Sequence, residues 1–244
     1  MVLAPATAGH SHEGARIWPV VPSEGLDRAE GPVELLAPRW HTAALIALMV
    51  AVAVTGTVLA PGDIPLERAT GRSRVVGVYL PLLLVNGGLT FYVCRVGRAR
   101  SALRSLLGRG WDSVGRACTD LALASAAWLV IEVVEAGFAT WRNTVALALL
   151  PHTVAERAMW VLVAMTVAFC EEVVYRGYLQ TQLTAFTRRA SVAVVLQALL
   201  FGVAHGEQGL AVALRFALYG VMFGALARWR RSLIPGIEIG RAHV

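Results

Sequence analysis

Lysine is absent from this sequence, and charge of either sign is scarce. All 22 basic residues among the 244 are arginine, and charged residues make up 16% of the chain against 57% hydrophobic residues. Soluble domains carry about 25% charged residues, so this composition argues against a soluble protein. An arginine-only basic set beside abundant Ala and Val is typical of coding bias in a GC-rich bacterial genome, and we expect no nucleic-acid partner.

Several signatures of other protein classes are also missing. The three cysteines, Cys94, Cys118 and Cys170, are odd in number and lie in or beside apolar runs, so no disulfide is expected. No Gly-rich phosphate loop and no H-E-x-x-H zinc-protease motif is present. The "HGE" at 205–207 matches the H-x-E of zinc deaminases, but the P-C-x-x-C that those enzymes require is missing.

Long apolar runs dominate the chain after a polar tail. Residues 1–38 are rich in proline and lack the apolar core of a signal peptide, so we expect a mostly disordered tail. Each following run is apolar enough to cross about 30 Å of hydrocarbon, except for the short fifth. The six runs are 40–60, 75–93, 117–138, one from 158 into 168–180, 191–205, and 209–227. A lipid-exposed backbone must satisfy its own hydrogen bonds. The sequence therefore predicts an all-α polytopic transmembrane bundle of six spans, with a truncated seventh starting at "SLIPGI".

The arginines indicate the orientation of these spans. They gather between spans two and three, after span four and after span six, at Arg95, Arg98, Arg100, Arg104, Arg109, Arg116, Arg188, Arg189, Arg228, Arg230 and Arg231. The positive-inside rule places these loops and the N-terminus in the cytoplasm, although Arg68, Arg72 and Arg74 favour the opposite side. We expect a multi-pass protein of the bacterial inner membrane. The basic segment 98–109 is either an amphipathic helix on the inner membrane face or a solvated loop.

The stretch "AFCEEVVYRGYLQ" (168–180) places charged residues at the cytoplasmic end of the predicted span four. Charges within a span are costly and usually functional. Glu172 and Arg176 are four residues apart and share one helix face, which predicts an ion pair. Glu171 points about 100° away, and such a carboxylate can act as a general base once it is removed from water. The competing interpretation is a snorkelling cluster that anchors a helix end.

A histidine ends the next span in "FGVAH" (201–205). A lone His at a helix end is often structural. Here, however, a neighbouring helix can bring His205 close to Glu171. A carboxylate and a neutral imidazole together can hold and deprotonate a water molecule aimed at a carbonyl.

The paired motifs "EEVVYRG" and "FGVAH", each at a helix end, resemble the CPBP family, also called the Abi or CAAX-protease family. These proteins are bacterial relatives of the Ras-converting CAAX prenyl endopeptidase. The resemblance covers roughly 117–237 and implies that Glu171 and His205 activate the attacking water, supported by Glu172 and Arg176. It leaves the cofactor open: zinc, bound by Glu171 and His205 if by any of these residues, or a glutamate mechanism without metal. Tyr175 stands where the family usually has Phe.

The C-terminus departs from the family pattern, in which a last-helix His and Asn stabilise the oxyanion. "RSLIPGI" (231–237) begins the expected helix, but His243 comes about three residues late and no Asn follows. "EIGRAHV" can be encoded by GAG ATC GGA AGA GCA CAC GTC, which matches a common sequencing-adapter read. We expect residues 238–244 to be a non-native tail and the gene to continue as an apolar helix with His and Asn. Resequencing the source DNA across codon 237 tests this, and a stop after Val244 would contradict it.

The sequence thus predicts four segments. These are a cytoplasmic tail (1–38), two spans with a basic loop (39–116), an incomplete CPBP-like protease domain (117–237), and the tail at 238–244. The predicted function is hydrolysis of a peptide bond in a membrane-associated or lipid-anchored protein, in a cavity open to the cytoplasm. Prenylated substrates are not implied, because the bacterial branch of the family is not tied to prenylation. The alternatives are a catalytically inactive scaffold or maturation partner and, third, a small transporter relaying protons. Asp120, at a span end, is expected to be interfacial.

Overall fold

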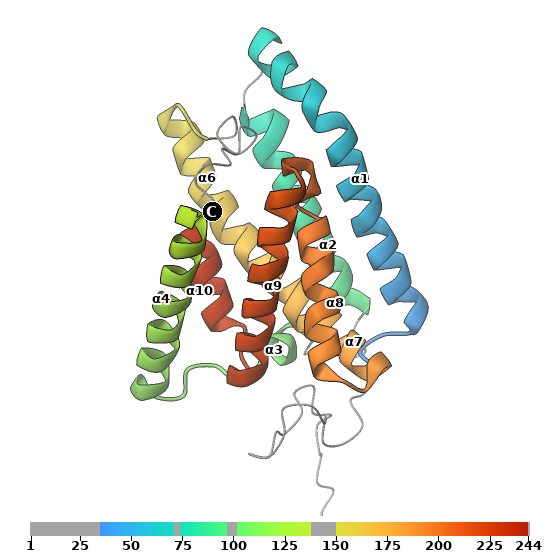
Figure 1. The fold of residues 1–244 in the computed structure, drawn as a ribbon, viewed down its shortest axis with the longest axis vertical. Coiled ribbons are helices and arrows are strands. Elements are labelled where there is room, and N and C mark those ends of the chain that lie inside the picture. Colours follow the sequence, from blue (N-terminus) through green and yellow to red (C-terminus); the bar gives the residue numbers. More distant parts are fainter. Residues whose placement is uncertain (1–34, 71–73, 97–101, 138–149, 244) are drawn as a thin grey trace, which may run out of the picture.

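The structure, a computed structural model, describes residues 35–70, 74–96, 102–137 and 150–243, and their side chains except at 59–70, 102, 135 and 241–243. These residues form helices joined by short turns and loops, with one isolated bridge between Gly108 and Ser232 and no strand among them. The order along the chain (Figure 1) is α1 (Arg39–Thr70), η1 (Val75–Tyr79), α2 (Leu80–Val96), α3 (Ala102–Leu107), α4 (Val114–Gly137), α6 (Val154–Glu171), η2 (Glu172–Leu179), α7 (Gln180–Thr187), α8 (Ala190–Val203), η3 (Gly206–Gln208), α9 (Leu210–Arg230) and α10 (Ile234–His243).

In the part of the chain that the structure describes, five helices are long and apolar enough to cross a membrane, which confirms an all-α, multi-pass membrane protein. They are Arg39–Val58, Val75–Val96, Val114–Val134, Val154–Thr187 and Leu210–Arg230. The predicted fifth span is the short helix α8, whose 14 residues measure about 21 Å and do not cover about 30 Å of hydrocarbon. Within the described residues, five of the six predicted spans are thus long enough for a full crossing, and the fifth is short, as the sequence predicts.

The C-terminal helix α10 runs as one helix from Ile234 to His243. The prediction of a non-native tail from residue 238 is not tested by this, and neither are the predicted segment boundaries. Most of the predicted disordered tail lies outside the described residues.

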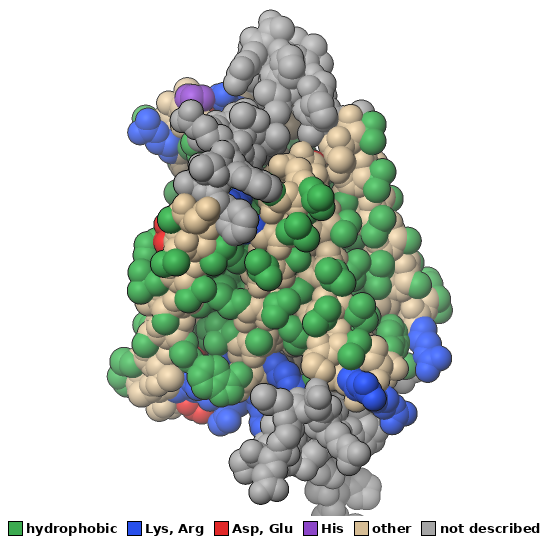
Figure 2. All heavy atoms as spheres, in the orientation of Figure 1, with side chains coloured by type: hydrophobic (Ala, Val, Ile, Leu, Met, Phe, Trp, Pro, Cys, Tyr) green, Lys and Arg blue, Asp and Glu red, His purple; other side chains and the backbone are tan. Residues whose placement is uncertain are grey.

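Figure 2 shows apolar side chains covering the flank of the bundle and arginines gathered at its lower end. Exposed arginines at that end of the helices include Arg104, Arg109, Arg188 and Arg189. An apolar flank bounded by basic residues suits a protein embedded in lipid. Which side of the membrane this end faces stays a prediction.

The helix that carries the two glutamates continues well past them. α6, η2 and α7 form one 34-residue helical stretch, Val154–Thr187, so Glu171 and Glu172 lie midway along it. The helix itself does not end at the two glutamates, and their place at the cytoplasmic end of a span stays a prediction. The polar residues that follow stay helical because the protein buries and binds them. Gln180 Nε2 donates to Gly224 O at 3.0 Å and Gln182 Nε2 to Ala37 O at 2.9 Å.

The π-helix η2 lies at the centre of the bundle. All eight residues from Glu172 to Leu179 are buried, so no side of this segment faces lipid. At Gly177 a Cβ atom would lie 3.3 Å from Leu106 of α3 and 3.2 Å from Leu233, which precedes α10. π-helical segments are rare and often occur at functional sites.

Small residues let α8 and α9 pack closely as an antiparallel pair. A Cβ at Gly220 would lie 2.7 Å from Ala198 Cα, and one at Gly202 would lie 2.9 Å from Ala217 Cβ. Membrane helices commonly use such small residues to approach each other. This pair fixes the positions of Phe201 and Phe223, which line the site described next.

Candidate active site

The buried ion pair that the spacing predicts is present in η2. Arg176 Nη1 lies 3.1 Å from Glu172 Oε1, and the two side chains are 1% and 3% exposed. Breaking such a pair by removing one partner leaves an uncompensated buried charge, which is strongly destabilising. Arg176 therefore fixes the position of Glu172 and neutralises its charge.

Aromatic rings surround the guanidinium of Arg176. Its Cζ lies 4.3 Å from the ring centroid of Phe201, 5.0 Å from that of Phe223 and 5.8 Å from that of Tyr175. A cation over ring faces is stabilised by the ring quadrupoles, and more so away from water. Nε and Nη2 are enclosed and have no hydrogen-bond partner among the described residues. The rings thus replace most of the polar contacts that an arginine usually makes.

Helix α10 covers the other side of this pair at Gly236. A Cβ atom at this position would lie 2.6 Å from Glu172 Cδ and closer still to its Oε2. Only glycine leaves room for the carboxylate there. The sequence analysis did not identify Gly236, since a glycine near a helix start carries no local sign of what it faces.

Glu171 differs from its neighbour in having no fixed partner. Its side chain is half-buried, and it forms no hydrogen bond or ion pair with the described part of the chain. It is near enough to Arg176 and Glu172 to interact electrostatically with both. The structure therefore separates the two carboxylates as the spacing predicts: Glu172 is paired, and Glu171 is available.

His205 follows the end of α8, at the turn leading to η3. Its Nδ1 lies 2.8 Å from Phe201 O. A carbonyl oxygen only accepts, so Nδ1 carries a proton in this contact. The ring stacks on Phe216 at 3.7 Å with an interplanar angle of 8°. These two contacts fix the orientation of the His205 ring.

Among the described residues, Glu171 and His205 form no direct hydrogen bond with each other. Phe201 packs edge-on against Tyr175, one turn after Glu171, at 5.0 Å and against His205 at 4.8 Å. Of the four predicted site residues, Glu172 and Arg176 are thus in contact. Phe201 lies next to both Arg176 and His205.

The turn after His205 packs against α1, a helix far away in sequence. Cβ atoms at Gly206 and Gly56 would lie 3.6 Å from Thr57 Oγ1 and 3.8 Å from Glu207 Cβ, respectively. α1 therefore packs against the turn that follows His205. The acidic residue Glu207 of η3 lies at this contact. The sequence analysis considered Glu207 only as part of a deaminase-like motif.

The donor set does not fit a zinc site. Among the described residues, no three or more His, Cys, Asp or Glu side chains lie close enough to hold a metal ion. Glu172 is occupied by Arg176, which leaves two candidate ligands, Glu171 and His205. We therefore derive no step through a metal.

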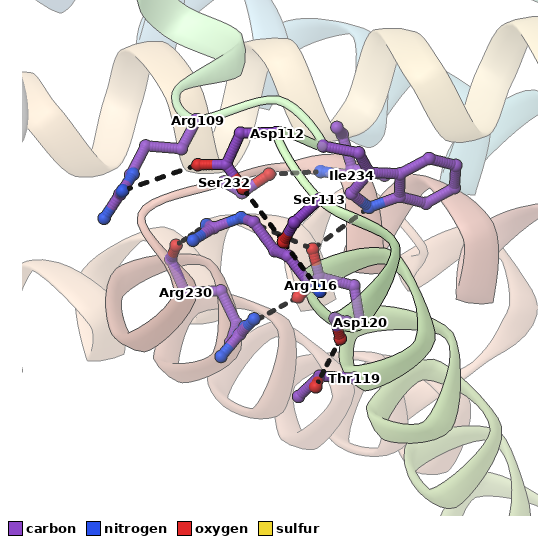
Figure 3. A network of polar contacts seen from close by, with 11 residues as sticks. Arg109, Asp112, Ser113, Arg116, Thr119, Asp120, Arg230, Ser232 and Ile234 are labelled. Atoms are coloured by element: carbon purple, nitrogen blue, oxygen red, sulfur yellow. Dashed lines mark hydrogen bonds and ion pairs between the residues drawn. The ribbon is translucent and has the colours of Figure 1, made fainter.

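A polar network around Asp120 fixes the turn between α9 and α10 (Figure 3). Asp120 Oδ1 accepts from Arg230 Nε at 2.6 Å and its Oδ2 from Trp111 Nε1 at 3.1 Å. Arg116 Nη2 donates to Arg230 O at 2.8 Å. Asp120 is 1% exposed, so its carboxylate is buried within the protein, and its position at the membrane interface stays a prediction. Holding this turn places Gly236 of α10 against Glu172.

Replacing Asp120 by asparagine is expected to destabilise the protein by about 1–3 kcal/mol, because hydrogen bonds to a buried charge are lost. Thermal unfolding of the purified protein in detergent measures this. The matched control is Asp112→Asn, since Asp112 is 60% exposed and lies 3.7 Å from Arg109, so its loss has little effect. Equal shifts in melting temperature for the two variants would show that the network does not hold the turn.

A comparison of this chain with models of known protein families supports the resemblance that the two sequence motifs indicate. A family model described as type II CAAX prenyl endopeptidase Rce1-like matches residues 153–239, which include Glu171, Glu172, Arg176 and His205. No curated protein matches the chain, and no solved structure matches it.

Proposed function

Because residues 153–239 form a domain of the Rce1-like type II CAAX prenyl endopeptidase family, we propose that the chain is a membrane-embedded endopeptidase. The observation that carries the proposal is that the two glutamates, Glu171 and Glu172, differ in their partners. Glu172 is fixed by Arg176 at 3.1 Å, whereas Glu171, on the same helix, has no hydrogen-bond or ion-pair partner among the described residues and is half-buried. A general base must come within hydrogen-bond reach of the proton that it removes, which an unpaired carboxylate can do.

In the proposed reaction, Glu171 takes a proton from a water molecule as its oxygen attacks the carbonyl carbon of a peptide bond. His205 Nε2 accepts the second hydrogen bond of that water and orients it. The tetrahedral intermediate then collapses, the C–N bond breaks, and the proton held by Glu171 passes to the leaving amine. Arg176 and Glu172 do not touch the substrate in this scheme, and their ion pair fixes the helical segment that directly follows Glu171.

The depth of the site supports a substrate held in the membrane. In Figure 1 the turn joining α8 and α9, which carries His205, lies below the upper ends of α1 and α6. α8 is too short to span the hydrocarbon, so its end is recessed within the bundle. We therefore propose a segment of a membrane-associated or lipid-anchored protein as substrate.

Cleavage can be tested without knowing the substrate. Protein N-termini in membranes are compared by mass spectrometry between cells producing this chain and cells producing Glu171→Gln. An endopeptidase is expected to generate new internal N-termini that depend on Glu171. Identical sets of termini from equal amounts of the two folded proteins would contradict the proposal and favour a non-catalytic scaffold.

A further inference from the structure

Helix α1, at the edge of the bundle in Figure 1, is fastened to the rest of the protein at its lower end. Gln182 of α7 donates from Nε2 to Ala37 O at 2.9 Å and to Thr42 Oγ1 at 2.8 Å. Its Oε1 accepts from Leu36 N at 2.8 Å. Gln182 is buried, so breaking these bonds would leave polar groups away from water without partners, which is costly. The start of α1 is therefore held firmly against α7.

The packing of α1 becomes lighter towards its upper end. Leu45, Met49 and Ala53 follow one another at intervals of four residues, lie on one face and are buried. The next contact on this side is that of Gly56, which has no side chain, with η3. Among the described residues, 43–58 form no hydrogen bond with another element. Smaller side chains bury less apolar surface, so less free energy opposes the separation of this half of α1 from the bundle.

The helical hydrogen bonding of α1 is also weakened beside this contact. Pro61 lies within α1 and has no N–H to donate to Thr57 O, four residues back. The hydroxyl of Thr57 donates to Ala53 O at 2.8 Å, a type of bond that often bends helices. Thr57 also meets η3, since a Cβ atom at Gly206 would lie 3.6 Å from Thr57 Oγ1. α1 is therefore weakened where it meets the turn after His205.

The opposite, lower side of the site is closed by elements that are tied together. Gly177 of η2 is covered by Leu106 of α3 and by Leu233, which are both buried. A backbone hydrogen bond from Leu233 N to Leu107 O, 3.0 Å long, joins these two segments. Entry from the arginine-rich end would have to break this packing. The contact between α1 and η3 is the weaker boundary of the two.

The outer face of α1 is apolar. Val54 and Val58, which flank the contact with η3 in the sequence, are 55% and 70% exposed. In a membrane this face lies against hydrocarbon, so an apolar protein segment could approach α1 without leaving the lipid. A water-soluble peptide would have to lose the hydration of its polar groups on the same route, which is costly.

We infer that a membrane-held apolar segment of the substrate enters from the lipid between α1 and η3, as the upper half of α1 moves about its fastened lower end. This rests on the proposed function. In the closed state α1 covers the turn that follows His205, and its movement exposes that turn to the segment. α1 precedes the matched domain by many residues, so this route belongs to the chain outside that domain.

A disulfide between α1 and η3 tests this route. A Cβ atom at Gly56 would lie 3.8 Å from Glu207 Cβ, a separation usual for disulfides, so Gly56→Cys with Glu207→Cys should form one on mild oxidation. The full chain is assayed in lipid vesicles with a peptide that carries an apolar membrane segment beside a cleavage site found by the N-terminus comparison. We expect the linked protein to lose cleavage, down to the level of Glu171→Gln. Reduction of the disulfide should restore the rate of the unmodified chain.

The single cysteine variants, oxidised in the same way, are the matched controls, because they contain the same native cysteines, Cys94, Cys118 and Cys170. They should keep full activity. Thr57→Cys with Gly206→Cys crosses the same contact and repeats the test if the first pair is inactive when reduced.

Several results would overturn the inference while the proposed function stands. These are cleavage by the linked protein at the unlinked rate, failure of both pairs to form a disulfide, and equal losses in the oxidised single variants. Loss of activity in both pairs when reduced would also overturn it, because the contact itself and not its opening would then be needed. If the unmodified chain shows no Glu171-dependent cleavage, the proposed function fails and the inference falls with it.

Discussion

Glu171→Gln is expected to lower the rate of peptide hydrolysis by about 10²–10⁴-fold, the usual contribution of a positioned general base. Glutamine keeps the shape of the side chain but cannot take a proton from water. Glu171 makes no ion pair or hydrogen bond with the described residues, so the substitution should leave the fold intact. Glu171→Gln therefore separates a loss of catalysis from a loss of folding.

The measurement is kcat/KM for cleavage of a synthetic peptide in lipid vesicles, with melting temperature recorded in parallel. The peptide spans a cleavage site found by the comparison of protein N-termini. Glu132→Gln is the control, because Glu132 is an exposed carboxylate on the span of α4. It should leave both values unchanged. Full activity in Glu171→Gln would remove Glu171 as the base, and equal losses in the two variants would indicate a general effect of membrane carboxylates.

Arg176→Met is expected to destabilise the bundle by about 3–5 kcal/mol, because it leaves Glu172 charged and buried without a partner. The expected effect is large since Glu172 is 3% exposed and its carboxylate is covered by Gly236. The ring contacts with Phe201 and Phe223 would also lose their cation. Unfolding of the purified protein in mixed detergent with increasing denaturant gives the change in free energy.

The double variant Glu172→Gln with Arg176→Met separates pairing from packing. Removing both charges is often close to neutral, whereas removing one is costly. We therefore expect the double variant to be more stable than Arg176→Met alone. If the losses measured for Glu172→Gln alone and for Arg176→Met alone simply add in the double variant, the ion pair does not couple these residues and the proposed support for Glu171 loses its basis.

The sequence was informative where local spacing decides the outcome. Apolar runs predicted the spans, and the four-residue separation predicted the pair of Glu172 with Arg176. The continuation of the helix beyond Arg176 was not evident from the sequence, because the polar residues after Arg176 resemble a solvated helix end. They are instead buried by partners from distant elements, such as Gly224 O for Gln180 and Ala37 O for Gln182.

Other features depend on tertiary contacts that no local pattern contains. Asp120 and Arg230 are 110 residues apart, and only the folded bundle brings them to 2.6 Å. Gly236 matters because Glu172 lies against it, and α1 packs against the turn after His205 although it precedes the matched domain by many residues. These contacts between residues distant in the sequence cannot be recognised before the fold is known.

The π-helical segment η2 between α6 and α7 also sets the rotation of α7 about the helix axis relative to α6. Gln180 N–H bonds to Tyr175 O, five residues back, so this turn holds one more residue than an α-helical turn. Deleting one residue here would restore α-helical bonding and rotate α7 by about 100° relative to α6. Gln180 and Gln182 would then point away from Gly224 and Ala37. The extra residue thus allows one continuous helix to present Glu171 to the site and its glutamines to neighbouring helices.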